Sequence, residues 1–254
     1  MFPSLWNSLM KFAPVALLFG VIVLVGSSNG ADDAGWLKLS GGKLDGWQKV
    51  GKWFSSTEVK LDEKNPKRLF ATMGNEGDPI IVNGDTGSTN DLLTKQQFTD
   101  VEVKCEFLIA KGSNSGVKLH GLYEIQILDT GNKKELTGDS TGGIYPKAEF
   151  KPNYHHIDKG VPPKVNAAKV PGEWQSLHII FTGPRFDAEG KKTTNAKFVK
   201  VVLNDKVIHD NVEVLTPTGH NYVKKEVAKG PVLLQGDHGP VAFRNVLIRE
   251  WTKD

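Results

Sequence analysis

The stretch Asn114-Ser-Gly-Val-Lys-Leu-His-Gly-Leu-Tyr-Glu-Ile-Gln-Ile-Leu-Asp129 decides how the rest of the chain is interpreted. It predicts two β-strands with a break at Gly121-Leu122, because apolar and polar residues alternate on both sides of the break. In the second strand Tyr123, Ile125 and Ile127 share one side, since successive side chains of a strand point to opposite faces. A sheet with such an apolar face has to bury it, so the stretch predicts part of a packed β-structure.

The opposite side of these two strands carries a dense set of polar side chains. It holds Lys118, His120, Glu124 and Gln126, and Asp129 follows at the end of the second strand. A carboxylate, a carboxamide and an imidazole together are more typical of a functional site than of a solvated exterior. The alternative is a polar outer face on which Glu124 pairs with Lys118 across the hairpin.

Residues 1–31 predict a secretory signal peptide. One positive charge precedes an apolar run over residues 13–25, and small residues follow it. The run is short for a membrane span, although an uncleaved anchor is the competing interpretation. The prediction is an exported protein, periplasmic or extracellular, that is not held by a membrane after cleavage.

The charge and the cysteine count narrow the class of protein. The chain has 32 Lys and Arg against 29 Asp and Glu, a net charge of +3, and without residues 1–31 the balance is 31 against 29, or +2. This value argues against nucleic acid as a partner. Cys105 is the single cysteine, so stability has to come from a large core. Its place among apolar residues predicts a buried filler rather than a nucleophile.

Further strands follow outward from the central stretch. Alternating patterns predict them over residues 98–110, 196–203, 206–214, 231–235 and 241–251, and another begins after Trp174. Asn204-Asp205 predicts a hairpin turn, and the proline-rich residues 147–172 predict a long, functional loop. No helical stripe is evident after residue 31. We therefore predict an all-β sandwich that forms a single domain over residues 32–254.

Six signatures then resemble a known bacterial family, the 3-keto-disaccharide hydrolases, in order and spacing through nearly the whole chain after residue 31. They are Gly46-Trp47, Asn114-Ser-Gly116, Tyr123-Glu-Ile-Gln-Ile-Leu-Asp129, Gly142-Gly-Ile-Tyr145, Gly172-Glu-Trp174 and Leu234-Gln-Gly-Asp-His-Gly-Pro-Val-Ala-Phe-Arg-Asn245. The resemblance implies a concanavalin-A-like jelly roll of two curved antiparallel sheets. It also implies a glycosidase-like hydrolase or lyase that acts on a di- or oligosaccharide, or another glycoside, oxidised to a ketone at C3. The sequence departs from the family at His120, where relatives tend to have Arg, and at Gln175, where Asn is usual.

A 3-keto group makes the C2 hydrogen acidic, because the resulting carbanion is delocalised onto the ketone oxygen. A base removes this proton, a donor stabilises the enolate, and the C1 aglycone leaves; water can then add back. Glu124 is the candidate base, Arg244 could hold the enolate oxygen or a sugar hydroxyl, and His238 could serve as the acid or as a metal ligand. The predicted substrate-binding residues are Asn114, Lys118, His120, Gln126, Tyr145 and Gln235.

Two of these assignments have simpler alternatives. Arg244 alternates with Val241 and Phe243, so it points away from the core and could pair with a neighbouring strand. His238 lies in a predicted turn, Asp237-His-Gly239, which its imidazole could stabilise.

The sequence also allows a divalent metal ion as a cofactor. Asp129 and Asp237, together with Glu124 and His238, offer oxygen ligands and one nitrogen that would suit Ca²⁺ or Mn²⁺. No compact ligand spacing links them.

Two other functions fit the same scaffold. Glu124-Ile-Gln-Ile-Leu-Asp129 is similar to the acidic triplet of jelly-roll glucanases, so a conventional glycoside hydrolase is one alternative, provided that a bulge turns Asp129 inward. The other alternative is a non-catalytic carbohydrate-binding module, because a fold does not fix a function.

Overall fold

The computed structural model describes residues 35–253, except for residues 42, 73–78, 85, 131, 132 and 134. The predicted signal peptide therefore lies outside the described residues. Residues 35–254 form one compact unit. In the described part of the chain, no helix has the length and apolar character that a membrane span requires.

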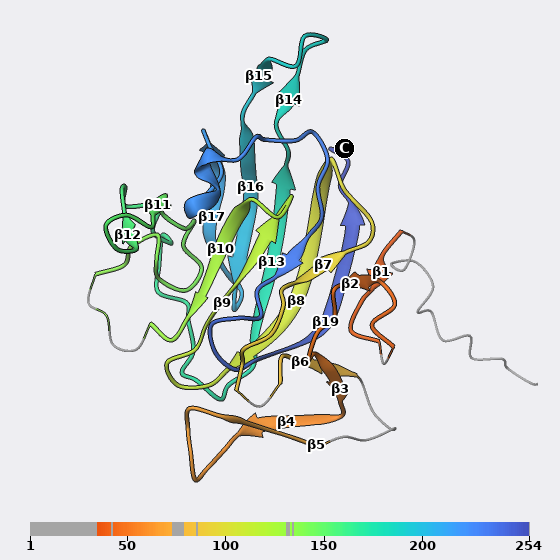
Figure 1. Ribbon diagram of the computed structural model, residues 1–254, viewed down its shortest axis with the longest axis vertical. Helices are drawn as coiled ribbons and strands as arrows, with labels where there is room; N and C mark the ends of the chain where they lie inside the picture. The colour runs from red at the N-terminus through yellow and green to blue at the C-terminus, as the bar shows by residue number, and fades with distance from the viewer. Residues whose placement is uncertain are drawn as a thin grey trace, which may run out of the picture. The chain divides into compact units, whose positions relative to one another are not determined.

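The larger of two main sheets has eight strands, and all its pairs are antiparallel (Figure 1). In spatial order they are β17 (Lys206–Val214), β16 (Ala196–Leu203), β13 (Gln175–Thr182), β8 (Asp100–Ile109), β19 (Val241–Glu250), β6 (Ile80–Val82) and β3 (Phe54–Ser56), and β1 (Leu37–Lys38) also pairs with β19. The central strands β8 and β19 are the longest, ten residues each, because both faces of this sheet are covered over part of their length.

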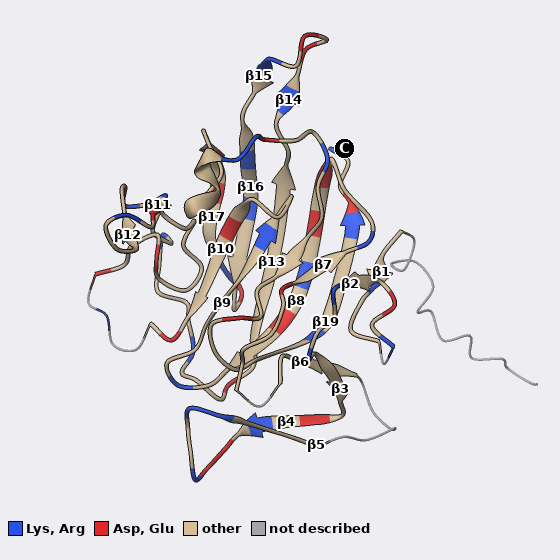
Figure 2. Cartoon of the chain, in the orientation of Figure 1, with Lys and Arg blue, Asp and Glu red and all other residues tan. Residues whose placement is uncertain are grey.

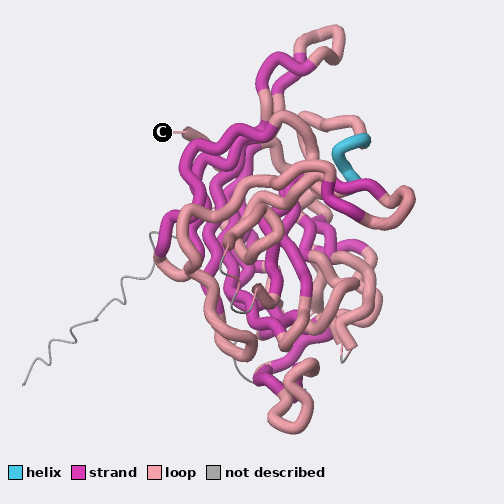
Figure 3. Tube along the Cα trace, turned by 90° about the vertical axis from the view of Figure 1, so that its left-hand side faces the viewer, coloured by secondary structure: helices cyan, strands magenta, loops and turns pink. Residues whose placement is uncertain are grey.

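The smaller main sheet has five strands and contains the central stretch of the sequence. Its order is β10 (Tyr123–Leu128), β9 (Asn114–Leu119), β18 (Leu233–Leu234), β7 (Leu92–Thr94) and β2 (Trp47–Gln48), again with antiparallel pairs. Three two-stranded hairpins accompany the main sheets: β4 (Glu58–Leu61) with β5 (Leu69–Thr72), β11 (Ala148–Glu149) with β12 (His155–His156), and β14 (Arg185–Phe186) with β15 (Lys192–Thr194). In the described residues the one helical element is the short η1 (His220–Val223), which Figure 3 shows among strands and loops.

The core lies between the two main sheets. Phe107, Phe181 and Phe243 reach into it from the larger sheet, and Val117 and Ile125 reach it from the smaller one, all fully buried. Burying one such side chain contributes about 1.5–3 kcal/mol, so this cluster supplies the stability that no disulfide provides. Cys105 belongs to the cluster, and burial raises the pKa of its thiol to about 12, which confirms the predicted filler role.

The all-β jelly-roll prediction is confirmed, and several strand bounds agree to the residue. The predicted strands over residues 196–203 and 206–214 are β16 and β17, and β10 is the second strand predicted after the break at Gly121-Leu122. The predicted turn at Asn204 and Asp205 joins β16 to β17, and both residues have positive φ, 47° and 64°, as a tight hairpin turn requires. Residues 147–172 hold only the short β11 and β12 and are otherwise loop, as predicted.

The outer face of the larger sheet carries paired charges rather than an open site. Glu102 on β8 accepts hydrogen bonds from Arg249 and His178 on the flanking strands, both at 2.7 Å. Glu106 pairs with Arg244 in the same way, so acidic and basic residues lie side by side along β8 and β19 (Figure 2).

Candidate active site

A cavity of about 660 Å³ lies over the outer face of the five-stranded sheet. Its sides are formed by the loop after β10, by the region of η1 and by the turn that follows β18. The lining residues are Asp91, Asn114, Lys118, Glu124, Tyr145, Phe150, Tyr154, Gly219, His220, Asn221, Gln235, Asp237 and His238. This volume is in the range of ordinary ligand sites.

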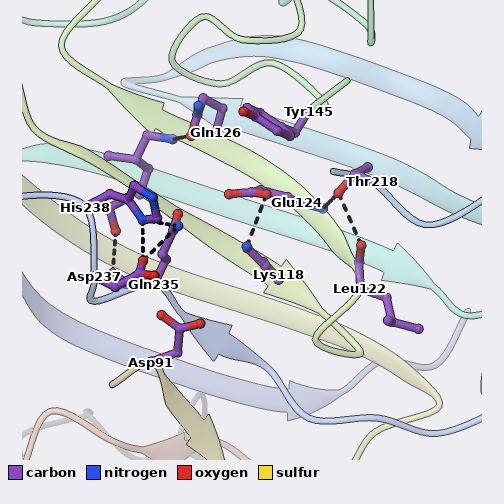
Figure 4. A network of polar contacts seen from close by, with 12 residues as sticks. Asp91, Lys118, Leu122, Glu124, Gln126, Tyr145, Thr218, Gln235, Asp237 and His238 are labelled. Carbon is purple, nitrogen blue, oxygen red and sulfur yellow. Dashed lines mark hydrogen bonds and ion pairs between the residues drawn. The ribbon is translucent and has the colours of Figure 1, made fainter. Parts of the chain in front are cut away.

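The floor of the cavity is the pair Glu124 and Lys118. They are register partners on β10 and β9, so both point away from the core that their neighbours Ile125 and Val117 fill. The Lys118 Nζ lies 3.3 Å from Glu124 Oε2, and both residues are buried, 5% exposed for Glu124 and 9% for Lys118 (Figure 4). The pairing that sequence analysis raised as the alternative to a site is thus present, but it occurs inside a cavity.

Gly116 makes this placement of Glu124 possible. A Cβ at position 116 would lie only 2.3 Å from Glu124 Oε1, so the carboxylate occupies the space that any other residue would fill. The Asn114-Ser-Gly116 signature therefore contains a glycine because the Glu124 carboxylate lies close to the β9 backbone at this position.

The segment 142–145 continues the sheet beyond β10 and positions Tyr145. The Gln126 N–H donates to Gly143 O at 2.9 Å, and the Tyr145 N–H donates to Glu124 O at 3.1 Å. Tyr145 is therefore held beside Glu124 as a wall of the cavity (Figure 4). Its hydroxyl lies 3.0 Å from the hydroxyl of Tyr154 and 3.0 Å from His156 Nε2.

Asp237 and His238 form a second polar group at the cavity, on the turn between β18 and β19. His238 Nδ1 lies 2.5 Å from Asp237 Oδ1, and the Gln235 amide donates to Asp237 Oδ1 at 3.0 Å (Figure 4). The His238 carbonyl accepts from the Asn114 N–H at 2.9 Å, which ties this turn to the start of β9.

Asp91 is a site residue that sequence analysis missed. It immediately precedes β7, and its carboxylate accepts from the Gly236 N–H at 2.9 Å across the β7–β18 pair. The loop residues Phe150, His220 and Asn221 were missed as well. The prediction of a functional loop over residues 147–172 was the available signal for Phe150; Asp91, His220 and Asn221 gave none.

Two buried acceptors in the cavity wall are unsatisfied. In the described residues, the buried side-chain atoms without a hydrogen-bond partner are Asn221 Oδ1 and Gln235 Oε1. Both residues line this cavity. Unpaired buried oxygens cost about 1–3 kcal/mol each, a cost that ligand hydroxyl donors in the cavity would offset.

The charges of the site follow from burial and from neighbouring groups. Burial raises the pKa of Glu124, although the Lys118 ammonium opposes this. Burial alone would lower the pKa of Lys118, but the carboxylates of Glu124 and Asp91 raise it, so Lys118 stays protonated. Burial also raises the pKa of Asp91. The hydrogen bond to Asp237 raises the pKa of His238, which favours an imidazolium.

Arg244 does not join this group, so the prediction that it meets Glu124 in one trough is wrong. Its side chain points away from the core, as the alternation with the buried Phe243 predicted. However, Arg244 lies on β19 of the larger sheet, whereas Glu124 lies on the smaller sheet. Its guanidinium donates to Glu106 at 2.6 Å and lies 4.2 Å from the Trp174 ring centre. The two residues therefore occupy the outer faces of different sheets, and the alternative, an ion pair with a neighbouring strand, is correct.

The sequence pattern also predicted the wrong side of the sheet for the His120 side chain. Its φ of 54° ends the alternation of β9, and the imidazole turns to the core side. Its ring nitrogens lie 3.0 Å from Thr99 O and 3.2 Å from Val227 O, and its ring packs edge-on against Phe181. Burial lowers the pKa of this histidine, so it is a neutral structural residue rather than a sugar contact.

Gln126 lies in the same strand as Glu124, and Asp129 follows the end of that strand, but neither residue is in the described lining of the cavity. The Gln126 amide donates to Asp139 at 3.1 Å and its carbonyl accepts from the Ile127 N–H, and Gln126 is absent from the described lining. Asp129 accepts from the Gly112 N–H at 2.8 Å beyond the end of β10. Asp237 lines the cavity and Asp129 is absent from its described lining, so the structure does not bring the two predicted metal ligands together in that lining. Among the described residues, no three His, Cys, Asp or Glu side chains are grouped to hold a metal ion.

Comparisons with known proteins agree with this picture. Residues 35–249 match the family described as the 3-keto-alpha-glucoside-1,2-lyase-like domain. A crystal structure of a Parabacteroides distasonis protein, provisionally named a glycosyl hydrolase, is 27% identical, with a TM-score of 0.58 over 86% of this chain and 84% of that chain. A second protein of the same organism and provisional name is 19% identical, with a TM-score of 0.52 over 85% of this chain and 99% of that chain, and shows the shared fold. A comparison with curated proteins finds no match.

The match spans nearly the whole described chain and includes both sheets and every residue that lines the cavity. It confirms the resemblance drawn from the six signatures, and it indicates a carbohydrate-active enzyme. The chain belongs to the family of 3-keto-alpha-glucoside-1,2-lyase-like domains.

Proposed function

We propose that this protein cleaves glycosides that carry a ketone at C3, by elimination across C1 and C2. The observation that carries the proposal is the Glu124 carboxylate, buried at the floor of a polar cavity with its pKa raised and an ammonium 3.3 Å away. A base whose pKa lies closer to the working pH takes a carbon-bound proton more effectively than an ordinary surface carboxylate. The unpaired oxygens of Asn221 and Gln235 support a ligand rich in hydroxyl groups.

In the first step Glu124 accepts the C2 proton, and the C–H electron pair moves onto the C3 ketone oxygen to form an enolate. Lys118 takes the role first assigned to Arg244, because its ammonium is the cation beside Glu124 at the cavity floor. A charged donor in a site of low water content stabilises such an oxyanion strongly. The Lys118 ammonium also opposes the rise that burial causes in the pKa of Glu124.

In the second step the enolate re-forms the C3 ketone, a C1–C2 double bond forms, and the bond from C1 to the aglycone oxygen breaks. The His238 imidazolium, favoured by Asp237, donates its proton to the departing oxygen. The products are an unsaturated keto sugar and an alcohol, and addition of water to the double bond would complete a net hydrolysis.

A conventional glycoside hydrolase has less support. In the sequence, the glucanase-like motif paired Glu124 with Asp129 as the two catalytic carboxylates. In the structure, Asp129 accepts a hydrogen bond from the N–H of Gly112. Retaining hydrolysis requires two carboxyl groups about 5–5.5 Å apart on either side of the bond.

The test is to incubate the protein with 3-keto-glucosides of both anomeric configurations and with the unoxidised glucosides. Release of the alcohol is measured, together with exchange at C2 in heavy water. We expect turnover only of the keto substrates and a loss of about 10²–10⁴-fold in kcat for Glu124→Gln. Glu58→Gln, an exposed carboxylate on β4, is the matched control. Cleavage of unoxidised glucosides, or full activity of Glu124→Gln, would contradict the proposal.

We also propose that the protein acts outside the cytoplasm, after removal of residues 1–31. N-terminal sequencing of protein recovered from the periplasm or medium tests this, and an intact Met1 in that fraction would contradict it.

A further inference from the structure

A second cavity of about 460 Å³ adjoins the active-site cavity. Its lining residues are Ala148, Glu149, Phe150, Lys151, His220, Tyr222 and Val223, contributed by β11, the loop after it, and η1. Phe150 and His220 line both cavities, so the two spaces meet at these rings. The ring centres of Phe150 and His220 are 5.0 Å apart, and Phe150 also packs against Tyr154 at 5.5 Å.

The chemistry of the second cavity differs from that of the first. The exposed surface of its lining is mostly apolar, and the side chains of Phe150 and Val223 in that lining are 61% and 72% exposed. Its one carboxylate, Glu149, already accepts a hydrogen bond from Tyr222 Oη at 2.5 Å. Lys151 and His220 are the other polar residues of the lining, and an apolar ring in this cavity would cover the exposed side chains of Phe150 and Val223.

We infer that this second cavity is the site for the leaving group of the substrate, and that it selects glycosides with an apolar, aromatic aglycone. The inference rests on the proposed function, because the polar cavity with Glu124 is taken to hold the keto sugar. The glycosidic bond places the aglycone directly beside that sugar. Phe150 and His220 belong to the walls of both cavities, so the apolar lining begins directly beside the proposed sugar site.

Benzyl and methyl 3-keto-glucosides provide the test, since their leaving alcohols are similarly acidic and the ratio of their kcat/KM values reports aglycone contacts. We expect the wild-type protein to prefer the benzyl substrate. Phe150→Ala should lower the benzyl-to-methyl ratio about tenfold, as loss of one aromatic contact implies. Val223→Ser, a residue of the second cavity only, should lower the ratio about threefold.

Val170→Ser is the matched control, because Val170 is 63% exposed and is absent from the described lining of both cavities. It should leave the ratio unchanged, and melting temperatures of all variants check that they fold. A wild-type ratio near one, or a ratio that Val223→Ser and Phe150→Ala do not change, would overturn the inference while leaving the proposed function intact.

If no keto-glycoside is cleaved, the proposed function fails. The aglycone site is then tested separately, by measuring the binding of uncleaved glucosides. Calorimetry with unoxidised benzyl and methyl glucosides then measures the same preference. Tighter binding of the benzyl compound, lost in Val223→Ser, would support the aglycone site. Equal binding of both compounds, or no binding, would overturn it.

Discussion

Replacing Gly116 with alanine tests the site more sharply than removing a charged group, because it moves Glu124 without changing any functional side chain. The added Cβ would lie 2.3 Å from Glu124 Oε1 and 3.1 Å from both Cγ and Cδ. Ordinary contacts begin near 3.4 Å, so the carboxylate has to shift by about 1 Å, and a misplacement of that size can cost about 10²-fold in rate.

The fold should tolerate the same substitution. Gly116 lies in β9 and is not among the positive-φ glycines, so alanine fits the backbone. Replacing glycine at a compatible position restricts the unfolded chain and stabilises by about 0.4–1 kcal/mol, which offsets part of the cost of moving the ion pair. We therefore expect kcat/KM for a 3-keto-glucoside to fall about 100-fold while the melting temperature changes little.

Two further variants make the measurement decisive. Gly41→Ala is the control, because a Cβ there meets nothing within 4 Å. Gly116→Ala combined with Glu124→Asp shortens the acid and relieves the clash, so its loss should be smaller than the product of the two single losses. A Gly116→Ala protein with wild-type kcat/KM would refute the assignment of Glu124 as the base.

Three other outcomes are expected. The pH profile of kcat/KM should be bell-shaped: activity rises as Glu124 loses its proton above the ordinary value of 4.5, and falls as His238 loses its proton above 6.5. Asp237→Asn removes the hydrogen bond that raises the pKa of His238, so the alkaline limb should move to lower pH; an unmoved limb would remove His238 as the acid. Arg244→Met should cost about 1 kcal/mol in denaturant unfolding and leave kcat/KM unchanged, because its pair with Glu106 is about one-third exposed and remote from the cavity; a large kcat effect would contradict this.

Much of the fold could be predicted from local pattern. Apolar residues spaced along each strand and the turn at Asn204 and Asp205 located β16 and β17 to the residue, and alternation located β10 after the break at Gly121-Leu122. The same pattern put Glu124 and Lys118 on one face and Ile125 and Val117 on the other, as the structure has them. His120 was misassigned because a single residue with positive φ, which alternation does not reveal, reversed its side chain.

The sequence by itself determined which side chains of each strand point away from the core, and six signatures in order determined the family. Only the tertiary structure decided which outward-facing residues meet. A sandwich has two outer faces, and a period of two cannot distinguish them, so Arg244 and Glu124 looked equivalent although they lie on different sheets. Conversely, Asp91 reaches the turn at Gly236, which is 145 residues away in the chain, because β7 pairs with β18. Such long-range pairing depends on how whole sheets assemble, and no local pattern encodes it.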